Sequence, residues 1–271
     1  MYSKAPDFPW RLPLGILLCV AAILSYPGGL AAQTADDVIS AYLKARGGLD
    51  KIKAVQTERV TATLTLQPGT DATLIYERKR PLKMHMEIIT GGRSFLRVYD
   101  GKSSGWVYNP FTPNPVVQAM SANEIPGVAE ESDLDGPFVD YKAKGNRIEY
   151  AGKEDVEGVS ANKLKLTSRQ GEVSFFLFNP STGLILKWEG TRKVKDRTTG
   201  EDVEVPWQNF FRDFREVNGL KYPFVVESGA VDGSQTQKIS TSKVEINIPL
   251  DDAEFAEPKP TALPAEPAGT N

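Results

Sequence analysis

Apolar and polar residues alternate along most of this chain with a period of two, the pattern of strands that bury one face. From Val60 to Leu66, every second residue is apolar and each residue between is a threonine. The segment 82–88 repeats this alternation, with His85 at one of its polar positions. The same reasoning predicts further strands over 73–79, 93–100, 104–108, 147–152, 161–168, 172–178, 184–191, 203–217, 221–231 and 236–247.

Short turn sequences separate the predicted strands, among them Pro68-Gly69, Asn218-Gly219 and Asp232-Gly233. Parallel neighbours would need crossover connections of about a dozen residues or more, which this spacing does not provide. The pattern therefore predicts a mainly β (α+β) fold, built as an antiparallel meander of about ten strands.

One clear helix is predicted before the strands, over 34–46. Thr34 is placed to cap it, and Asp37 is the matching capping-box partner. Gly47-Gly48 ends it, because glycine readily adopts the left-handed conformation that follows a helix. This leading helix can cover only part of a sheet of that width.

The connection 109–140 breaks the strand rhythm. It holds five prolines and two short helical signals, at 121–124 and 130–134. A long connection within a compact domain is often a lid or a binding loop. The alternative is a plain excursion over the surface.

Residues 1–32 are predicted to form a signal peptide, because a basic start leads to a short apolar run and then to small residues. The cleavage position is Ala32, with Ala31 as the second choice. Two alternatives are an uncleaved membrane anchor and lipid modification of Cys19. We therefore expect an exported protein with its folded domain over 33–256.

The C-terminal segment 257–271 is rich in proline and alanine and is predicted to be a disordered tail.

The side-chain chemistry excludes several classes of site. The chain has one histidine, His85, and one cysteine, Cys19, which lies in the predicted signal peptide. A cysteine nucleophile and a zinc site of cysteine and histidine ligands are thereby excluded. A net charge of −3 offers no basic excess for nucleic acid, and no glycine-rich phosphate or dinucleotide motif is present. We expect no cofactor, no metal and no nucleic-acid partner.

Carboxylates are plentiful but form no recognisable catalytic pair. Glu130, Glu131, Asp133 and Asp135 cluster in the long connection. Such a cluster could bind Ca²⁺ or serve a hydrolase, but acidic loops are ordinarily only solvated. We therefore expect a protein that is not an enzyme.

The positive signal is the amount of apolar strand surface, which must be covered somehow. With so few helices, either the sheet curls around a filled core, or an apolar cavity remains between sheet and helices. A cavity with a mobile cover would suit an acyl chain, and methionines would adapt to variable chains. The residues alone leave these two alternatives open.

The order of several short segments resembles the bacterial outer-membrane lipoprotein-sorting family, the LolA-like periplasmic carriers. Each segment is weak alone, and the resemblance comes from their order over about residues 35–258. The segments are 42–48 (YLKARGG), 99–108 (YDG, then GWVY), 136–141 (GPFVDY), 152–158, 213–223 (DFREVNGLKYP) and 249–258.

The resemblance implies a strongly curved antiparallel sheet, an unclosed barrel, with helices plugging its concave side. It also implies a periplasmic carrier that holds acyl chains of a lipid or lipoprotein and moves them toward the outer membrane without catalysis. Its further partners would be inner- and outer-membrane transport proteins. In that family an arginine locks the lid, and Arg59 is our candidate for it.

The apolar faces of neighbouring strands supply the candidate lining, although some of these residues must face the other side of the sheet. The candidates are Leu64, Leu66, Met84, Met86, Phe95, Trp106, Phe175, Leu177, Leu186, Trp188, Phe224 and Val226. The competing hypotheses are an envelope structural or interaction protein with a filled core, and a hydrolase that uses Asp133 and Asp135.

Overall fold

The computed structural model describes residues 33–67, 69–195 and 202–259. The predictions for residues 1–32, and for the tail beyond residue 259, lie outside the described residues. No helix within the described ranges is long and apolar enough to cross a membrane.

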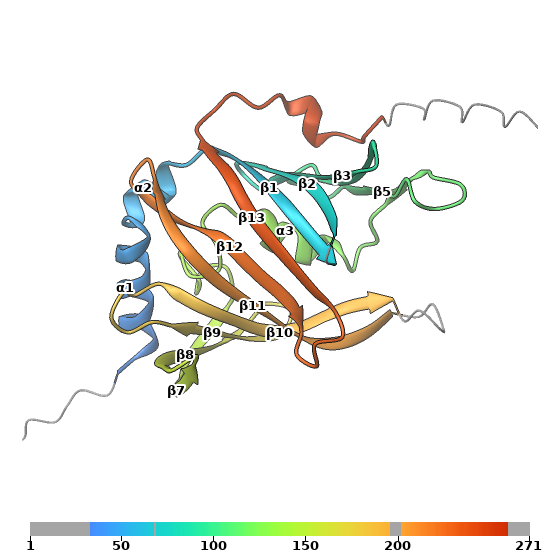
Figure 1. Cartoon of the computed structure of the whole chain (residues 1–271). Coiled ribbons are helices and arrows are strands. Elements are labelled where there is room, and N and C mark those ends of the chain that lie inside the picture. Colours follow the sequence, from blue (N-terminus) through green and yellow to red (C-terminus); the bar gives the residue numbers. More distant parts are fainter. Residues whose placement is uncertain (1–32, 68, 196–201, 260–271) are drawn as a thin grey trace, which may run out of the picture. The chain divides into compact units, whose positions relative to one another are not determined.

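The described chain forms one sheet with few helices (Figure 1). The helices are α1 (Ala35–Arg46), α2 (Leu49–Ala54), α3 (Ile125–Ser132) and the short 3-10 helix η1 (Asp252–Phe255). The strands are β1 (Thr57–Gln67), β2 (Thr70–Lys79), β3 (Lys83–Thr90), β4 (Arg93–Tyr99), β5 (Gly105–Tyr108), β6 (Val117–Ala119), β7 (Arg147–Val156), β8 (Val159–Thr167), β9 (Val173–Phe178), β10 (Ile185–Lys195), β11 (Asp202–Val217), β12 (Leu220–Ala230) and β13 (Thr236–Ile246).

The sheet is antiparallel throughout, and its order is β6-β5-β4-β3-β2-β1-β13-β12-β11-β10-β9-β8-β7. It is therefore a meander whose first and last strands pair in the middle, with β6 and β7 at the two edges. This confirms the predicted curved, unclosed antiparallel sheet, although it has 13 strands rather than about ten. One strand that sequence analysis missed is β6, whose three residues are too few to show a periodicity.

The predicted leading helix is present as α1, with the capping box that the sequence indicates. The Thr34 hydroxyl accepts from the Asp37 amide at 3.1 Å, and the Asp37 carboxylate accepts from the Thr34 amide at 3.0 Å. The helix ends at Gly47, where φ is 125° and a Cβ would lie 2.2 Å from the Gly219 carbonyl oxygen. Only glycine fits this contact between α1 and the β11–β12 turn.

The strand register shows which side chains lie on each of the two faces of the sheet. We call the face on which α1, α2 and α3 pack the inner face, and the opposite one the outer face. Ile52 of α2 packs with Val60 and Phe224, and Val128 of α3 packs with Met84, so these strand residues define the inner face. On the outer face, η1 contacts β3 and β4 and buries Phe255.

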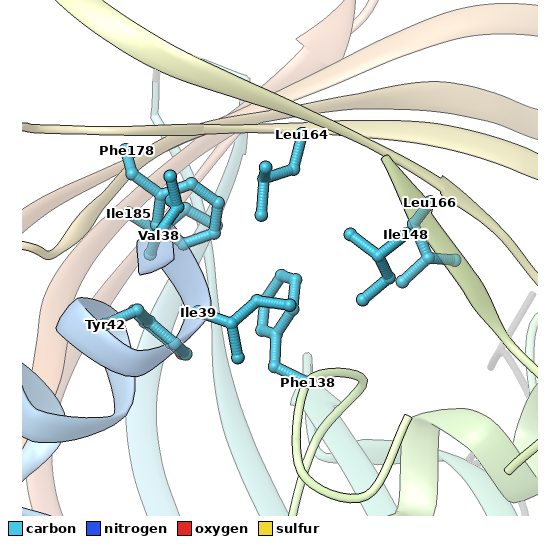
Figure 2. Close-up of a cluster of buried hydrophobic side chains, with 9 residues drawn as sticks. All are labelled: Val38, Ile39, Tyr42, Phe138, Ile148, Leu164, Leu166, Phe178 and Ile185. Carbon is cyan, nitrogen blue, oxygen red and sulfur yellow. The ribbon is translucent and has the colours of Figure 1, made fainter. Parts of the chain in front are cut away.

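An aromatic core fills the inner face over β7–β10. Figure 2 shows side chains of α1 meeting Phe138 and residues of β7–β10 in one buried cluster. The Phe138 ring makes edge-to-face contacts with Tyr42 at 5.2 Å and with Phe178 at 5.4 Å between centroids. Phe138 lies in the connection 109–140, so part of that connection belongs to the core. We call this part of the molecule the closed half.

Candidate functional site

The inner face over β1–β4 and β11–β13 carries rows of apolar side chains that pair directly from strand to strand. One row runs Phe211, Val226, Ile239, Leu64 and Ala72 across five strands. These cross-strand pairs place the side chains within contact of each other on one face. The result is a continuous apolar strip that crosses the middle of the sheet.

A second row runs beside the first across β1–β4. It consists of Ala62, Leu74, Ile88 and Phe95, each opposite the next in the register. We call the two rows together with Met86 the inner apolar surface.

The inner apolar surface is only partly removed from water. Within the described chain, the cluster around Ala62, Leu64, Ala72 and Leu74 consists of strand residues alone. The larger side chains that pack against it, among them Met86, Ile88 and Ile239, are half-buried. An apolar surface of this kind can gain about 25 cal/mol for each Å² that a ligand removes from water.

Helix α3 covers one end of this surface. Its Val128 is fully buried against Met84 and Tyr99, while Ile125 and Ala129 pack beside it. Pro126 lies in the first turn of the helix, where the absence of an N–H is tolerated. The helix has eight residues and belongs to the connection 109–140, the segment that the sequence suggested as a lid.

Arg78 of β2 joins α3 to the sheet. Its guanidinium donates to the Asp133 carbonyl at 3.2 Å and to the Glu131 carbonyl at 3.5 Å, both at the C-terminal end of α3. The same side chain pairs with the buried Glu58 of β1 at 2.6 Å. Tyr76 adds a hydrogen bond to the Glu131 carbonyl at 3.1 Å, and Arg97 forms an ion pair with the Glu131 carboxylate.

Burial and the neighbouring carboxylates determine the protonation states of Arg78 and Tyr76. Burial alone would lower the pKa of Arg78, but the Glu58 carboxylate raises it overall, so the guanidinium stays charged. Burial and the Glu131 carboxylate both raise the pKa of Tyr76, which therefore keeps its hydroxyl proton for the bond to α3. The cover over the inner apolar surface is thus held by charge-assisted hydrogen bonds to backbone carbonyls.

The structure divides the candidate lining residues between the two faces. On the inner face it brings together Leu64, Met84, Met86, Phe95, Trp188, Phe224 and Val226. Leu66 follows Leu64 by two residues and lies at the exposed β1–β2 tip. On the outer face lie Trp106, opposite Val98, and Phe175, Leu177 and Leu186, which pack with Val156 and Phe210.

Arg59 also lies on the outer face, so it does not contact α3. It forms an ion pair with Glu77 of β2, which is nearly fully buried. His85 Nδ1 lies 3.3 Å from the same carboxylate, and Glu254 of η1 is hydrogen-bonded to it. The arginines that contact the end of α3 are therefore Arg78 and Arg97, whereas Arg59 pairs with Glu77 on the outer face.

Three of the four clustered acidic residues of the long connection, Glu131, Asp133 and Asp135, are engaged in ion pairs. Asp135 binds Arg80 at 2.5 Å, and Asp133 pairs with Lys144. Burial by itself would raise the pKa of Asp135, but Arg80 lowers it overall. Among the residues that the structure describes, no three His, Cys, Asp or Glu side chains gather in a way that could hold a metal ion.

Three solved structures share this architecture over most of their length. A DUF1329 family protein from Desulfovibrio piger superposes with a TM-score of 0.53 at 14% identity, covering 82% of this chain and 96% of that one. A LolA superfamily protein from Nitrosomonas europaea gives 0.51 at 13% identity, with 83% and 98% covered. A putative outer membrane lipoprotein-sorting protein domain from Vibrio parahaemolyticus gives 0.50 at 13%, with 80% and 97% covered.

The chain has the fold of the LolA superfamily. At these identities the similarity establishes the fold alone. The sequence matches no protein-family model and no curated protein. The activity must therefore be argued from the surfaces that this chain builds on the LolA fold.

Several residues of the site were missed in the sequence. Tyr76 and Arg78 continue the even-numbered row of Ala72 and Leu74, so period two could have placed Arg78 on the apolar face. Arg59, in contrast, alternates with Val60 and belongs to the other face by the same rule. No pattern in the sequence, however, indicates that the carbonyls at the end of α3 meet Arg78, because that contact joins residues 53 to 55 positions apart.

Proposed function

We propose that this protein is a periplasmic carrier that holds an acyl chain of a lipid or lipoprotein against the inner apolar surface and moves it toward the outer membrane without catalysis. The observation that carries the proposal is the inner apolar surface itself, where small and aliphatic residues such as Ala62 and Leu64 are buried but the larger side chains beside them, such as Met86 and Ile239, stay half-buried. In the closed half, by comparison, large side chains such as Phe138 and Phe178 are almost fully buried.

The LolA fold supports the proposal, since one of the similar structures is described as a putative lipoprotein-sorting domain. The cover also supports it. Helix α3 is eight residues long, packs on β3 and β4 through Val128, and is held at its C-terminal end by side chains of β2 and β4. Its displacement would leave every strand pairing of the sheet in place. A carrier needs such a cover, because cargo must be both shielded from water and released.

Neighbouring residues on one strand provide the test. Val226 faces the inner apolar surface, and Val225 faces outward. A Val226→Glu variant should lose at least about tenfold in uptake of a fluorescent fatty acid, because ligand would bury a carboxylate against hydrocarbon. Val225→Glu should bind as the unmodified protein does, and Met86→Glu should behave as Val226→Glu.

Far-ultraviolet circular dichroism of each variant shows whether its sheet is intact. Equal uptake by folded Val226→Glu, Met86→Glu and Val225→Glu variants would remove the inner apolar surface as the binding site. Native mass spectrometry of protein from its own periplasm, followed by lipid extraction, would identify the cargo. A clean apo mass together with no fatty-acid uptake would favour the envelope-interaction alternative.

A further inference from the structure

Exposed large apolar side chains gather at one side of the described structure. Seven such residues are exposed within the described ranges, and five of them lie at strand turns: Leu66 (39% exposed), Phe111 (51%), Val116 (59%), Val203 (38%) and Val231 (55%). These five come from the β1–β2, β5–β6, β10–β11 and β12–β13 connections. We call them the rim.

The rim residues share one edge of the sheet, because the antiparallel register places their strand ends on the same side. Leu66 and Val231 both line one groove of about 610 Å³, whose lining also includes outer-face residues such as Phe210, Arg212 and Glu227. The ring of Phe111 lies 6.0 Å from the guanidinium of Arg93, at the β3–β4 turn. The described strand ends that carry these residues lie on the side of the sheet away from α1 (Figure 1).

One part of the rim projects beyond the others. The Val231 amide donates to the Pro206 carbonyl at 3.0 Å, so pairing with the β12–β13 hairpin stops there. The β10–β11 hairpin continues past that point, where Val203 pairs with Val194. Val203 therefore lies farther along the strand direction than the β12–β13 tip.

The rim is continuous with the inner apolar surface. Leu66 follows Leu64 at the strand period of two, and the β12 row runs from Val226 through Ser228 to Ala230, next to Val231. An acyl chain that arrives at the rim would meet the inner apolar surface with little exposed polar surface between. In this respect the inference rests on the proposed carrier function.

We propose that the rim docks the protein on the surface of a phospholipid bilayer. The five side chains stand at four separate connections with polar residues between them, such as Asp71, Asp232 and Lys238, instead of forming one flat patch. A rigid protein partner would need a matching socket for each tip. A bilayer interface accepts separate apolar tips and leaves the neighbouring charges among the headgroups.

Flotation with vesicles of phosphatidylethanolamine and phosphatidylglycerol tests the proposal. The chain from Gln33 onward is used, because the described residues from Gln33 to Lys259 belong to one compact unit. The unmodified chain should float with the vesicles. A Leu66→Ser/Val231→Ser variant should bind about tenfold more weakly, and adding Phe111→Ser, Val116→Ser and Val203→Ser should abolish binding.

The chain offers a matched control in its two other exposed apolar residues. A Leu49→Ser/Val173→Ser variant removes the same two residue types from α2 and from the start of β9 and should float as the unmodified chain does. Equal loss in this control and in the rim variant would overturn the proposal. So would an unmodified chain that stays in solution with these vesicles, or that floats only with native membranes that retain their proteins.

Uptake of a fluorescent fatty acid from solution separates this inference from the carrier proposal. A Phe111→Ser/Val116→Ser/Val203→Ser/Val231→Ser variant, which leaves Leu66 in place, should take up the fatty acid normally while it floats much more weakly, because the inner apolar surface is unchanged. If no variant and no unmodified chain takes up fatty acid but flotation still depends on the rim, the docking surface stands and the carrier function fails.

Discussion

The two ends of the inner face are built in different ways. In the closed half, α1 and Phe138 complete an aromatic core in which Leu164 and Phe178 are almost fully buried. Over β1–β4, which we call the open half, strand side chains pack mainly against each other and α3 covers one end. The same sheet thus carries a filled core at one end and an incompletely buried apolar surface at the other.

The open half is held together by charges on both faces. On the inner face, Glu58 and Arg78 connect β1 and β2 to the end of α3. On the outer face, Arg59, Glu77 and Glu254 connect the strands to η1. The comparison teaches that the packing is uneven along one sheet: the closed half is a filled aromatic core, whereas the open half keeps half-buried apolar side chains, as the proposed carrier function requires.

The largest expected effect is in the closed half. Phe138→Ala removes a ring that contacts three other rings, so it should cost about 4 kcal/mol in the free energy of unfolding. Met86→Ala in the open half should cost only about 1 kcal/mol, because Met86 is half-buried and no tight cavity is left behind. Urea denaturation measures both, and equal losses would mean that the open half is packed as tightly as the closed half.

The next largest effect concerns the link between the sheet and α3. Arg78→Met leaves the buried Glu58 carboxylate without its partner and removes two hydrogen bonds to the carbonyls of α3. We expect a loss of about 3 kcal/mol in unfolding free energy. Amide hydrogen exchange should also become faster over 125–135, with α1 unchanged.

Arg212→Met is the control for that variant. Arg212 pairs with Glu157 and Glu227 near the surface, where ion pairs contribute about 0 to 1 kcal/mol each. Hydrogen exchange over α3 that stays as slow in Arg78→Met as in Arg212→Met would show that Arg78 does not hold the cover.

Clean alternation made the open half predictable from sequence. In 60–66 and 82–88, polar residues occupy every second position, so Leu64, Met84 and Met86 could be placed on one face, and the structure places them there. The antiparallel order followed from the short turns. The pairing of β1 with β13, in contrast, joins the two ends of the meander, and no local sequence pattern predicts it.

Alternation failed where both faces of a strand are apolar. In β9, Phe175 and Leu177 point outward while Phe176 and Phe178 point inward, and all four are apolar. Period two cannot choose between two such faces. Leu186 was misplaced for another reason, since the register shifts between Ile185 and Lys187 and moves its side chain to the outer face.

The smallest expected effect is a pH dependence confined to the open half. The hydrogen bond to Glu77, together with burial, raises the pKa of Glu254 to about 7. Burial opposes ionisation of Glu77, but the neighbouring His85, Glu254 and Arg59 side chains lower its pKa to about 2. The two carboxyls therefore share one proton below neutral pH, with the charge on Glu77 and the proton on Glu254.

The sign of the effect follows from these directions. Because the pKa of Glu254 is higher in the folded protein than in an unfolded chain, its contribution is complete below the unfolded value and is lost as the pH rises through about 7. The contribution of Glu77 is lost in the opposite direction, as the pH falls from the unfolded value toward about 2. The contact between η1 and the sheet should therefore be weaker at pH 8 than at pH 5.5.

Glu254→Gln should remove most of this difference, because an amide can donate to Glu77 at every pH. Exchange-resistant amides of β3 and η1, followed at pH 5.5 and pH 8 and corrected for intrinsic exchange, provide the measurement. The control is Glu257→Gln, an exposed glutamate in the same segment, which should keep the dependence of the unmodified chain. If the β7–β10 amides showed the same pH dependence as β3, charge would govern the closed half as well, and the contrast between the two halves would fail.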